Sequence, residues 1–153
     1  MRLYLVQHGE AKKEEEDPLR PLSERGREDI QEIAKYAKKL DIKANKIFHS
    51  GKLRAKQTAE IVAKKLNIEQ VIEAEELAPN ADPKVWEDRL SAMDEDIIVV
   101  GHLPHLSKLS GGLLCGDEEK EVVAFRMGGI VCLERNKDGR WSVEWMITPE
   151  IVF

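Results

Sequence analysis

A chain of 153 residues, of which 42% are hydrophobic, is long enough to form one domain with its own core. Its net charge of −5 argues against a nucleic-acid-binding surface, because the phosphate backbone requires a basic stripe. No apolar run approaches the roughly 18 residues of a membrane span, and the first apolar segment starts too early to leave room for a signal peptide. Cys115 and Cys132 lack C-x-x-C spacing and predict neither a zinc site nor a disulfide framework. We expect a single cytoplasmic domain, residues 1–153, with no nucleic-acid or membrane partner.

The first predicted element is a buried strand, Leu3–Val6, which stops at Gln7-His8-Gly9. A tight loop at this point presents an imidazole, so His8 is a candidate nucleophile, although an isolated histidine of this kind more often simply ends a strand. The polar segment Glu10–Leu19 predicts a surface loop. Its acidic run, Glu14–Asp17, is either solvated or borders the active site and selects a partner by charge.

Two amphipathic helices are expected next, with a short strand between them. Ser23 is the predicted N-cap of the first helix. The strand lies within Asn45–Ser50, contains Ile47-Phe48 and is broken by Gly51. The inward-facing residues are Ile30, Ile33, Ala34, Ala37 and Leu40 in the first helix, and Ala55, Ala59, Val62, Ala63 and Leu66 in the second.

The second half of the chain continues the alternation and then changes period. A short strand is expected within Val71–Leu77, and Asp82-Pro83 starts a third helix with Val85, Trp86, Leu90 and Met93 facing inward. Asp96–His102 repeats the opening pattern of an apolar run ending in histidine. Leu103-Pro104 then opens a helix that includes Leu106, Leu109 and Leu113. Strands are predicted at Val122–Met127, Ile130–Arg135 and Trp141–Ile147, the last two joined as a hairpin around Asn136–Gly139.

This order of elements predicts an α/β domain with a mainly parallel sheet and antiparallel strands at one edge. In such sheets ligands bind outside the carboxyl ends of the strands. His8, Ser50 and His102 all fall at such ends.

Four separated motifs, taken together, resemble the histidine phosphatase superfamily, also called phosphoglycerate mutase-like, and within it the small SixA-type phosphohistidine phosphatases. The motifs are the strand ending in His8-Gly9, Arg20-Pro21-Leu22-Ser23, the stretch from Ser50 to Glu60 with its R-A-x-Q-T-A pattern, and Val100–Pro104. The resemblance covers nearly the whole chain and implies a three-layer α/β/α sandwich.

The resemblance implies that His8 accepts the phosphoryl group and that water then hydrolyses the phosphohistidine. A neutral imidazole is nucleophilic without a metal, and phosphoryl transfer mainly requires positioning and neutralisation of the equatorial oxygens. Arg54 at a helix start and His102 are the other expected catalytic residues. The expected substrate-binding residues are Gln7, Gly9, Arg20, Ser50 and Glu76. We expect neither a cofactor nor a metal.

The sequence departs from the family pattern at three positions. Gln7 stands where arginine is usual, and glutamine lacks the fixed charge of arginine. Charge-assisted hydrogen bonds are worth roughly 1.5–3 kcal/mol and neutral ones about 1 kcal/mol. We therefore expect turnover to be lower by about one order of magnitude. Gly51 replaces a usual proline and loosens the loop. His105, three residues after His102, has no family counterpart, and without an acidic ligand at helical spacing it does not predict a metal site.

The general acid is the least certain part of the predicted site, with Glu76 the first candidate and Glu10 the second. An imidazole leaving group tolerates a missing acid, because its nitrogen is easily protonated. We therefore expect a protein-borne phosphohistidine as substrate, for example on a phosphotransfer domain. The alternatives are a phosphatase of small phosphate esters and a phosphate-binding module that no longer turns over. The sequence does not indicate an oligomeric state.

Overall fold

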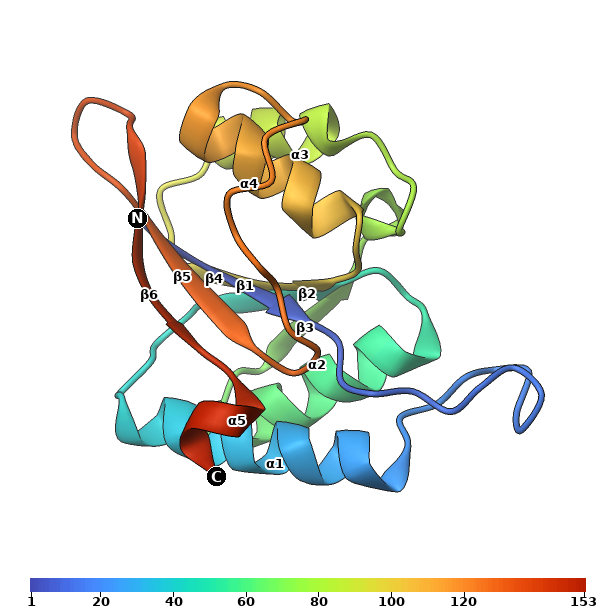
Figure 1. Cartoon of the computed structure of the whole chain (residues 1–153). Coiled ribbons are helices and arrows are strands. Elements are labelled where there is room, and N and C mark those ends of the chain that lie inside the picture. Colours follow the sequence, from blue (N-terminus) through green and yellow to red (C-terminus); the bar gives the residue numbers. More distant parts are fainter.

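A six-stranded sheet separates two layers of helices (Figure 1). The computed structural model describes residues 1–153. The strands are β1 (Arg2–Gln7), β2 (Lys46–His49), β3 (Gln70–Glu73), β4 (Ile97–Gly101), β5 (Ile130–Arg135) and β6 (Trp141–Ile147), in the order β3-β2-β4-β1-β5-β6. The pairs among β1, β2, β3 and β4 are parallel, whereas β5 pairs antiparallel with β1 and β6. The predicted α/β class and antiparallel edge are confirmed.

The helices cover both faces of this sheet. One face carries α1 (Glu24–Lys39), α2 (Leu53–Leu66) and the short α5 (Pro149–Val152), and the other carries α3 (Pro83–Ser91) and α4 (His105–Cys115). A 3₁₀ turn, η1 (Glu75–Leu77), connects β3 towards α3. None of the helices combines the length and apolarity that crossing a membrane requires.

Alternation along the central strands builds one core on each face of the sheet. In β1, Tyr4 and Val6 pack toward α1 and α2, while Leu3 and Leu5 pack toward α3 and α4. Successive side chains of a strand point to opposite faces, so a strand covered on both sides must be apolar throughout. This is why the run Leu3–Val6 lacks the polar alternation of a surface strand.

The parallel pairing brings several loops to one edge of the sheet, which we call the carboxyl edge because β1, β2 and β4 end there. Gln7 pairs with Gly101 and His49 pairs with Val100, so the three strands stop at the same level. The backbone N–H of His8 donates to Gly101 O at 3.1 Å. The residues that follow these strands therefore lie side by side.

The N-termini of the helices match their predicted caps. Ser23 accepts a hydrogen bond from Gly26 N at the start of α1, and Asp82 accepts one from Lys84 N at the start of α3. The predicted inward faces of α1 and α2 are buried up to their last residues: Leu66 is only partly buried, and Leu40 lies just beyond α1 with 43% exposure.

Other predictions for individual elements were wrong or incomplete. The segment Val122–Met127 forms no strand: Phe125 is buried in the α3–α4 core, and Val122 is 51% exposed. Val85, predicted to face inward, is exposed, because Trp86 occupies the inward side of α3 and Val85 lies on the outer side. The short strand expected within Val71–Leu77 is present as β3, one residue earlier and ending at Glu73, where η1 follows; α5 was not predicted.

Candidate active site

His8 begins the loop after β1 and is positioned by its own backbone. Its Nδ1 lies 2.7 Å from Gly9 O, and since a carbonyl only accepts, Nδ1 carries the proton. In the neutral ring the lone pair is therefore on Nε2. Burial lowers the pKa of His8 to about 4; the hydrogen bond to Gly9 opposes this change, and the charges of Arg54 and Arg20 add to it. The His8 ring is therefore neutral at neutral pH, which is the form in which an imidazole can act as a nucleophile.

His102 follows β4 and lies beside His8. The two ring centroids are 4.9 Å apart, with the rings tilted by 52°. His102 Nε2 is 2.6 Å from Ser50 Oγ, and the N–H of Lys52 donates to the same hydroxyl oxygen at 3.3 Å. Burial, followed by the neighbouring His8 and Arg54, lowers the pKa of His102 to about 3. The predicted residues at the ends of three strands are thus brought together.

Two arginines, one from α2 and one from the loop before α1, provide positive charge at the candidate site. Arg54 lies in the first turn of α2, is half-buried, and its Nε is buried without a partner in the chain. Arg20 lies on the loop before α1, where its φ of 48° and a hydrogen bond from its Nε to Lys12 O fix the turn. Both arginines and Lys52 line one hollow of about 540 Å³. A guanidinium and the free amides of a helix start are suited to phosphoryl oxygens.

Glu14, from the predicted acidic run, lines the same hollow as Arg20 and Arg54. The loop that carries it is otherwise exposed and extends beyond the end of β1 (Figure 1). Part of the acidic run therefore borders the candidate site.

Gln7 and Gly9 flank His8 in the positions expected from the sequence. Gln7 Oε1 is buried without a partner in the chain. Gly9 is enclosed, because a Cβ there would come within 2.8 Å of Ile30 Cγ1 and 3.1 Å of Gly26 O. A side chain at position 9 would therefore push the loop that carries His8 away from α1.

Two residues of the R-A-x-Q-T-A stretch position this loop, and their roles were missed in the sequence. The buried Thr58 accepts a hydrogen bond from Gly9 N at 3.1 Å, and Gln57 Oε1 accepts one from Leu22 N at 2.8 Å. They lie three and four residues after Arg54, on the same side of α2, and this helical spacing could have identified them. Through them α2 holds both the His8 loop and the segment after Arg20.

The candidate acids have partners of their own. Glu76 pairs with Arg89 at 3.0 Å, and the Arg89 guanidinium stacks 4.3 Å from the Trp86 ring. Glu10 accepts a hydrogen bond from Ser23 Oγ at 2.8 Å, which ties the His8 loop to the start of α1. Neither contact places a carboxylate against His8.

The remaining histidines lie outside the pair formed by His8 and His102. His105 is fully buried at the start of α4, neither ring nitrogen has a partner in the chain, and burial lowers its pKa to about 4. His49 Nδ1 accepts the Gly51 N–H at 3.1 Å and so supports the Ser50 loop. No group of three or more His, Cys, Asp or Glu side chains is arranged to hold a metal ion.

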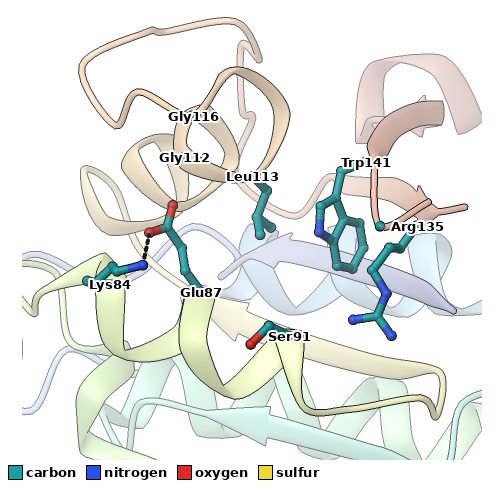
Figure 2. Close-up of a pocket in the computed structure, with 9 residues that line it drawn as sticks. Lys84, Glu87, Ser91, Gly112, Leu113, Gly116, Arg135 and Trp141 are labelled. Carbon is teal, nitrogen blue, oxygen red and sulfur yellow. Dashed lines mark ion pairs between the residues drawn. The ribbon is translucent and has the colours of Figure 1, made fainter. Parts of the chain in front are cut away.

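A separate hollow of about 460 Å³ lies between α3, α4 and the β5–β6 hairpin (Figure 2). Its charged side chains have partners in the chain: Lys84 pairs with Glu87, and the Arg135 guanidinium donates to the carbonyls of Leu90 and Met93. Gly112 leaves room for the Glu87 carboxylate against α4. This hollow contains none of the predicted site residues.

Comparison with known proteins agrees with the fold and the motifs. The family model of the histidine phosphatase superfamily (branch 1) matches residues 3–96, which is more than half of the chain. The phosphohistidine phosphatase SixA of Escherichia coli (strain K12) is 26% identical over 155 residues, covering 97% of this chain and 94% of SixA.

Solved structures extend this comparison to three dimensions. The protein histidine phosphatase SixA complexed with tungstate superimposes with a TM-score of 0.87 at 25% identity, with 97% of each chain covered. The α-ribazole phosphatase of Shigella flexneri shares the fold, with a TM-score of 0.82 at 18% identity and 97% of each chain covered. The chain belongs to the histidine phosphatase superfamily.

Proposed function

We propose that this phosphatase acts on phosphohistidine in a signalling protein through a covalent intermediate on His8. The observation that carries the proposal is the neutral His8 ring, which lies beside the His102 ring and within the field of Arg54 and Arg20. The similarity to SixA supports the same activity, and a solved SixA complex holds tungstate, a tetrahedral oxyanion like phosphate.

In the proposed first step, the lone pair of His8 Nε2 attacks phosphorus while the phosphorus–nitrogen bond of the substrate breaks. The leaving imidazole takes a proton from solvent. Arg54, Arg20 and His102 hold the equatorial oxygens, and Ser50 orients His102. In the second step, water attacks the phosphohistidine, releases phosphate and restores the neutral His8 ring, whose Nδ1–H still donates to Gly9 O.

The contacts of the two candidate acids favour this substrate over phosphate esters. An ester releases an alkoxide and requires a positioned acid, whereas an imidazole nitrogen is protonated readily. Glu76 is held by Arg89 and Glu10 by Ser23. We further propose that the reaction needs no metal and takes place in the cytoplasm, in keeping with the free thiols of Cys115 and Cys132.

The test is to trap the intermediate. Brief incubation with labelled phosphoramidate should leave acid-labile, base-stable phosphate on His8, and His8→Asn should abolish both label and turnover. His49→Asn keeps an acceptor for Gly51 N and is the matched histidine control, so it should retain the label. Absence of label together with full turnover in His8→Asn would contradict the mechanism.

A comparison of substrates completes the test. The ratio of kcat/KM for phosphoramidate to that for phosphoserine should be high. Faster hydrolysis of phosphoserine would favour an esterase, and binding of phosphate without turnover of either compound would identify a phosphate-binding module.

A further inference from the structure

A groove of about 740 Å³ lies between α1 and α2, which pack side by side on one face of the sheet (Figure 1). It is larger than the hollow that holds Arg20 and Arg54, and it contains none of the candidate site residues. Five cationic side chains line it: Arg27, Lys35 and Lys38 from α1, and Lys64 and Lys65 from α2. The only acidic side chains in its lining are Glu32 and Glu60. The groove is therefore strongly cationic, although the whole chain has a net charge of −5.

These five cations have no acidic partner within the chain. All five are exposed, and the ion pairs of the structure involve other lysines and arginines. Lys35 and Lys38 are three residues apart on the same side of α1, where like charges destabilise a helix. The chain thus gathers positive charge in one groove without balancing it.

The helix dipole explains only part of this charge pattern. Lys38, Lys64 and Lys65 lie in the last turns of their helices, where a positive charge is stabilising. Arg27 is the fourth residue of α1, close to the positive end of the dipole, where a cation is unfavourable. Lys35 lies before the last turn. Helix stability therefore does not account for the cations along the whole groove, whereas an anionic partner does.

The shape and the lining of the groove favour a peptide segment as this partner. Arg27 and Lys38 are separated by about 16 Å along the helix, so the cations form a strip and not a pocket for one phosphate. Apolar side chains lie among them, since Ala34 is buried and Ile61 is half-buried in the same lining. The two glutamates of the groove would repel a uniformly anionic chain such as polyphosphate. A peptide can combine carboxylates for the cations with apolar side chains for Ile61.

We propose that the groove between α1 and α2 is a docking site for an acidic segment of another protein. Carboxylates of the segment pair with the five cations, and its apolar side chains pack on Ile61. The charges provide steering and specificity, and the apolar contact adds affinity. On α2 the lining begins at Glu60, beyond the turn that carries Arg54, so docking leaves the candidate active site open.

The test measures binding of a labelled acidic peptide to the full chain by fluorescence anisotropy. The probe consists of Glu-Glu-Leu repeats and is about twelve residues long, which as a helix matches the length of the groove. Lys35→Glu and Lys64→Glu should each weaken binding about fivefold, because each replaces an attraction by a repulsion at an exposed pair. Binding by the parent should also weaken as salt is raised to about 0.5 M.

Lys137→Glu is the matched control, because it makes the same change of charge in the exposed turn between β5 and β6. It should leave the affinity unchanged. Unchanged circular dichroism verifies that the variants are folded, and the assay involves no turnover, so its result is independent of the proposed function.

Four results would refute the docking site. The parent fails to bind the peptide, Lys137→Glu weakens binding as much as the groove variants do, or polyphosphate binds more tightly than the peptide. In the fourth, the parent alone sediments as a dimer that Lys35→Glu dissociates, which would assign the groove to the acidic run Glu14–Asp17 of a second copy.

Discussion

Thr58→Val tests whether α2 positions the nucleophile through a single hydroxyl. The substitution preserves the shape of a fully buried side chain but removes the oxygen that accepts the Gly9 N–H at 3.1 Å. A buried donor left without a partner costs about 1–3 kcal/mol. We expect a loss of about 2 kcal/mol in the free energy of unfolding, measured by urea denaturation, from this unpaired N–H.

Turnover should fall as well, because Gly9 O is the acceptor that sets the orientation of the His8 ring. We expect kcat on phosphoramidate to drop about tenfold, since small displacements of a reacting group cost factors of this size or more. Thr58→Ser is the control: it keeps the hydroxyl and loses a methyl worth about 1 kcal/mol of burial, so its stability falls while its kcat does not. If Thr58→Ser loses as much turnover as Thr58→Val, or if Thr58→Val matches the parent in both assays, the hydroxyl does not position His8.

Three further predictions concern the same loop. Gln7→Arg should raise kcat about tenfold by restoring a charge-assisted contact to the phosphoryl group, and a kcat at or below the parent's would show that charge at this position is not limiting. Gly26→Ala would ordinarily favour a helix by about 1 kcal/mol, but here the new Cβ overlaps the carbonyl oxygen of Glu10. We expect a lower urea midpoint, and a higher one would contradict the close packing of this loop on α1. Because the neutral ring is favoured by burial, the His8 resonances should titrate with a pKa of about 4 in NMR, assigned with His8→Asn, so the fraction of nucleophilic His8 falls only below about pH 5. Titration near 6.5 would show a solvated ring.

The sequence was sufficient to predict an element when one physical rule determines both its secondary structure and its place in the fold. A buried parallel strand must be apolar on both faces and must end at the carboxyl edge, so the runs before His8 and His102 predicted two neighbouring histidines. Their contact, with ring centroids 4.9 Å apart, then depends only on the pairing of Gln7 with Gly101. The family motifs added Arg54 and Arg20, which the structure places together in one hollow.

What the sequence did not predict has a common cause: it depends on tertiary contacts with residues that are distant in the chain. Val122–Met127 has the composition of a strand, but the segment pairs with no strand, and its Phe125 side chain is buried in the core under α3 and α4 instead. The partner of Glu76 is Arg89, which comes from the following helix and which the sequence does not predict. Thr58 and Gln57 were visible as part of a motif, yet their hydrogen-bond partners lie 49 and 35 residues away in the chain.

The buried polar atoms without partners indicate which part of the fold serves function rather than stability. They belong to Gln7, Arg54, His102, His105 and Trp86. Each such atom costs free energy in a low-dielectric interior, so a fold under selection for stability alone would pair them. All but Trp86 lie at or directly beside the carboxyl edge, and Trp86 is covered by Arg89 in the core between η1 and α3. An oxyanion held between His8, His102 and Arg54 could accept from the Nε–H of Arg54, and rotation of the Gln7 amide presents it with a second donor. Under the proposed function, a phosphoryl group would supply the acceptor that the Nε–H of Arg54 lacks, which is the pattern expected when local stability is given up for binding and catalysis.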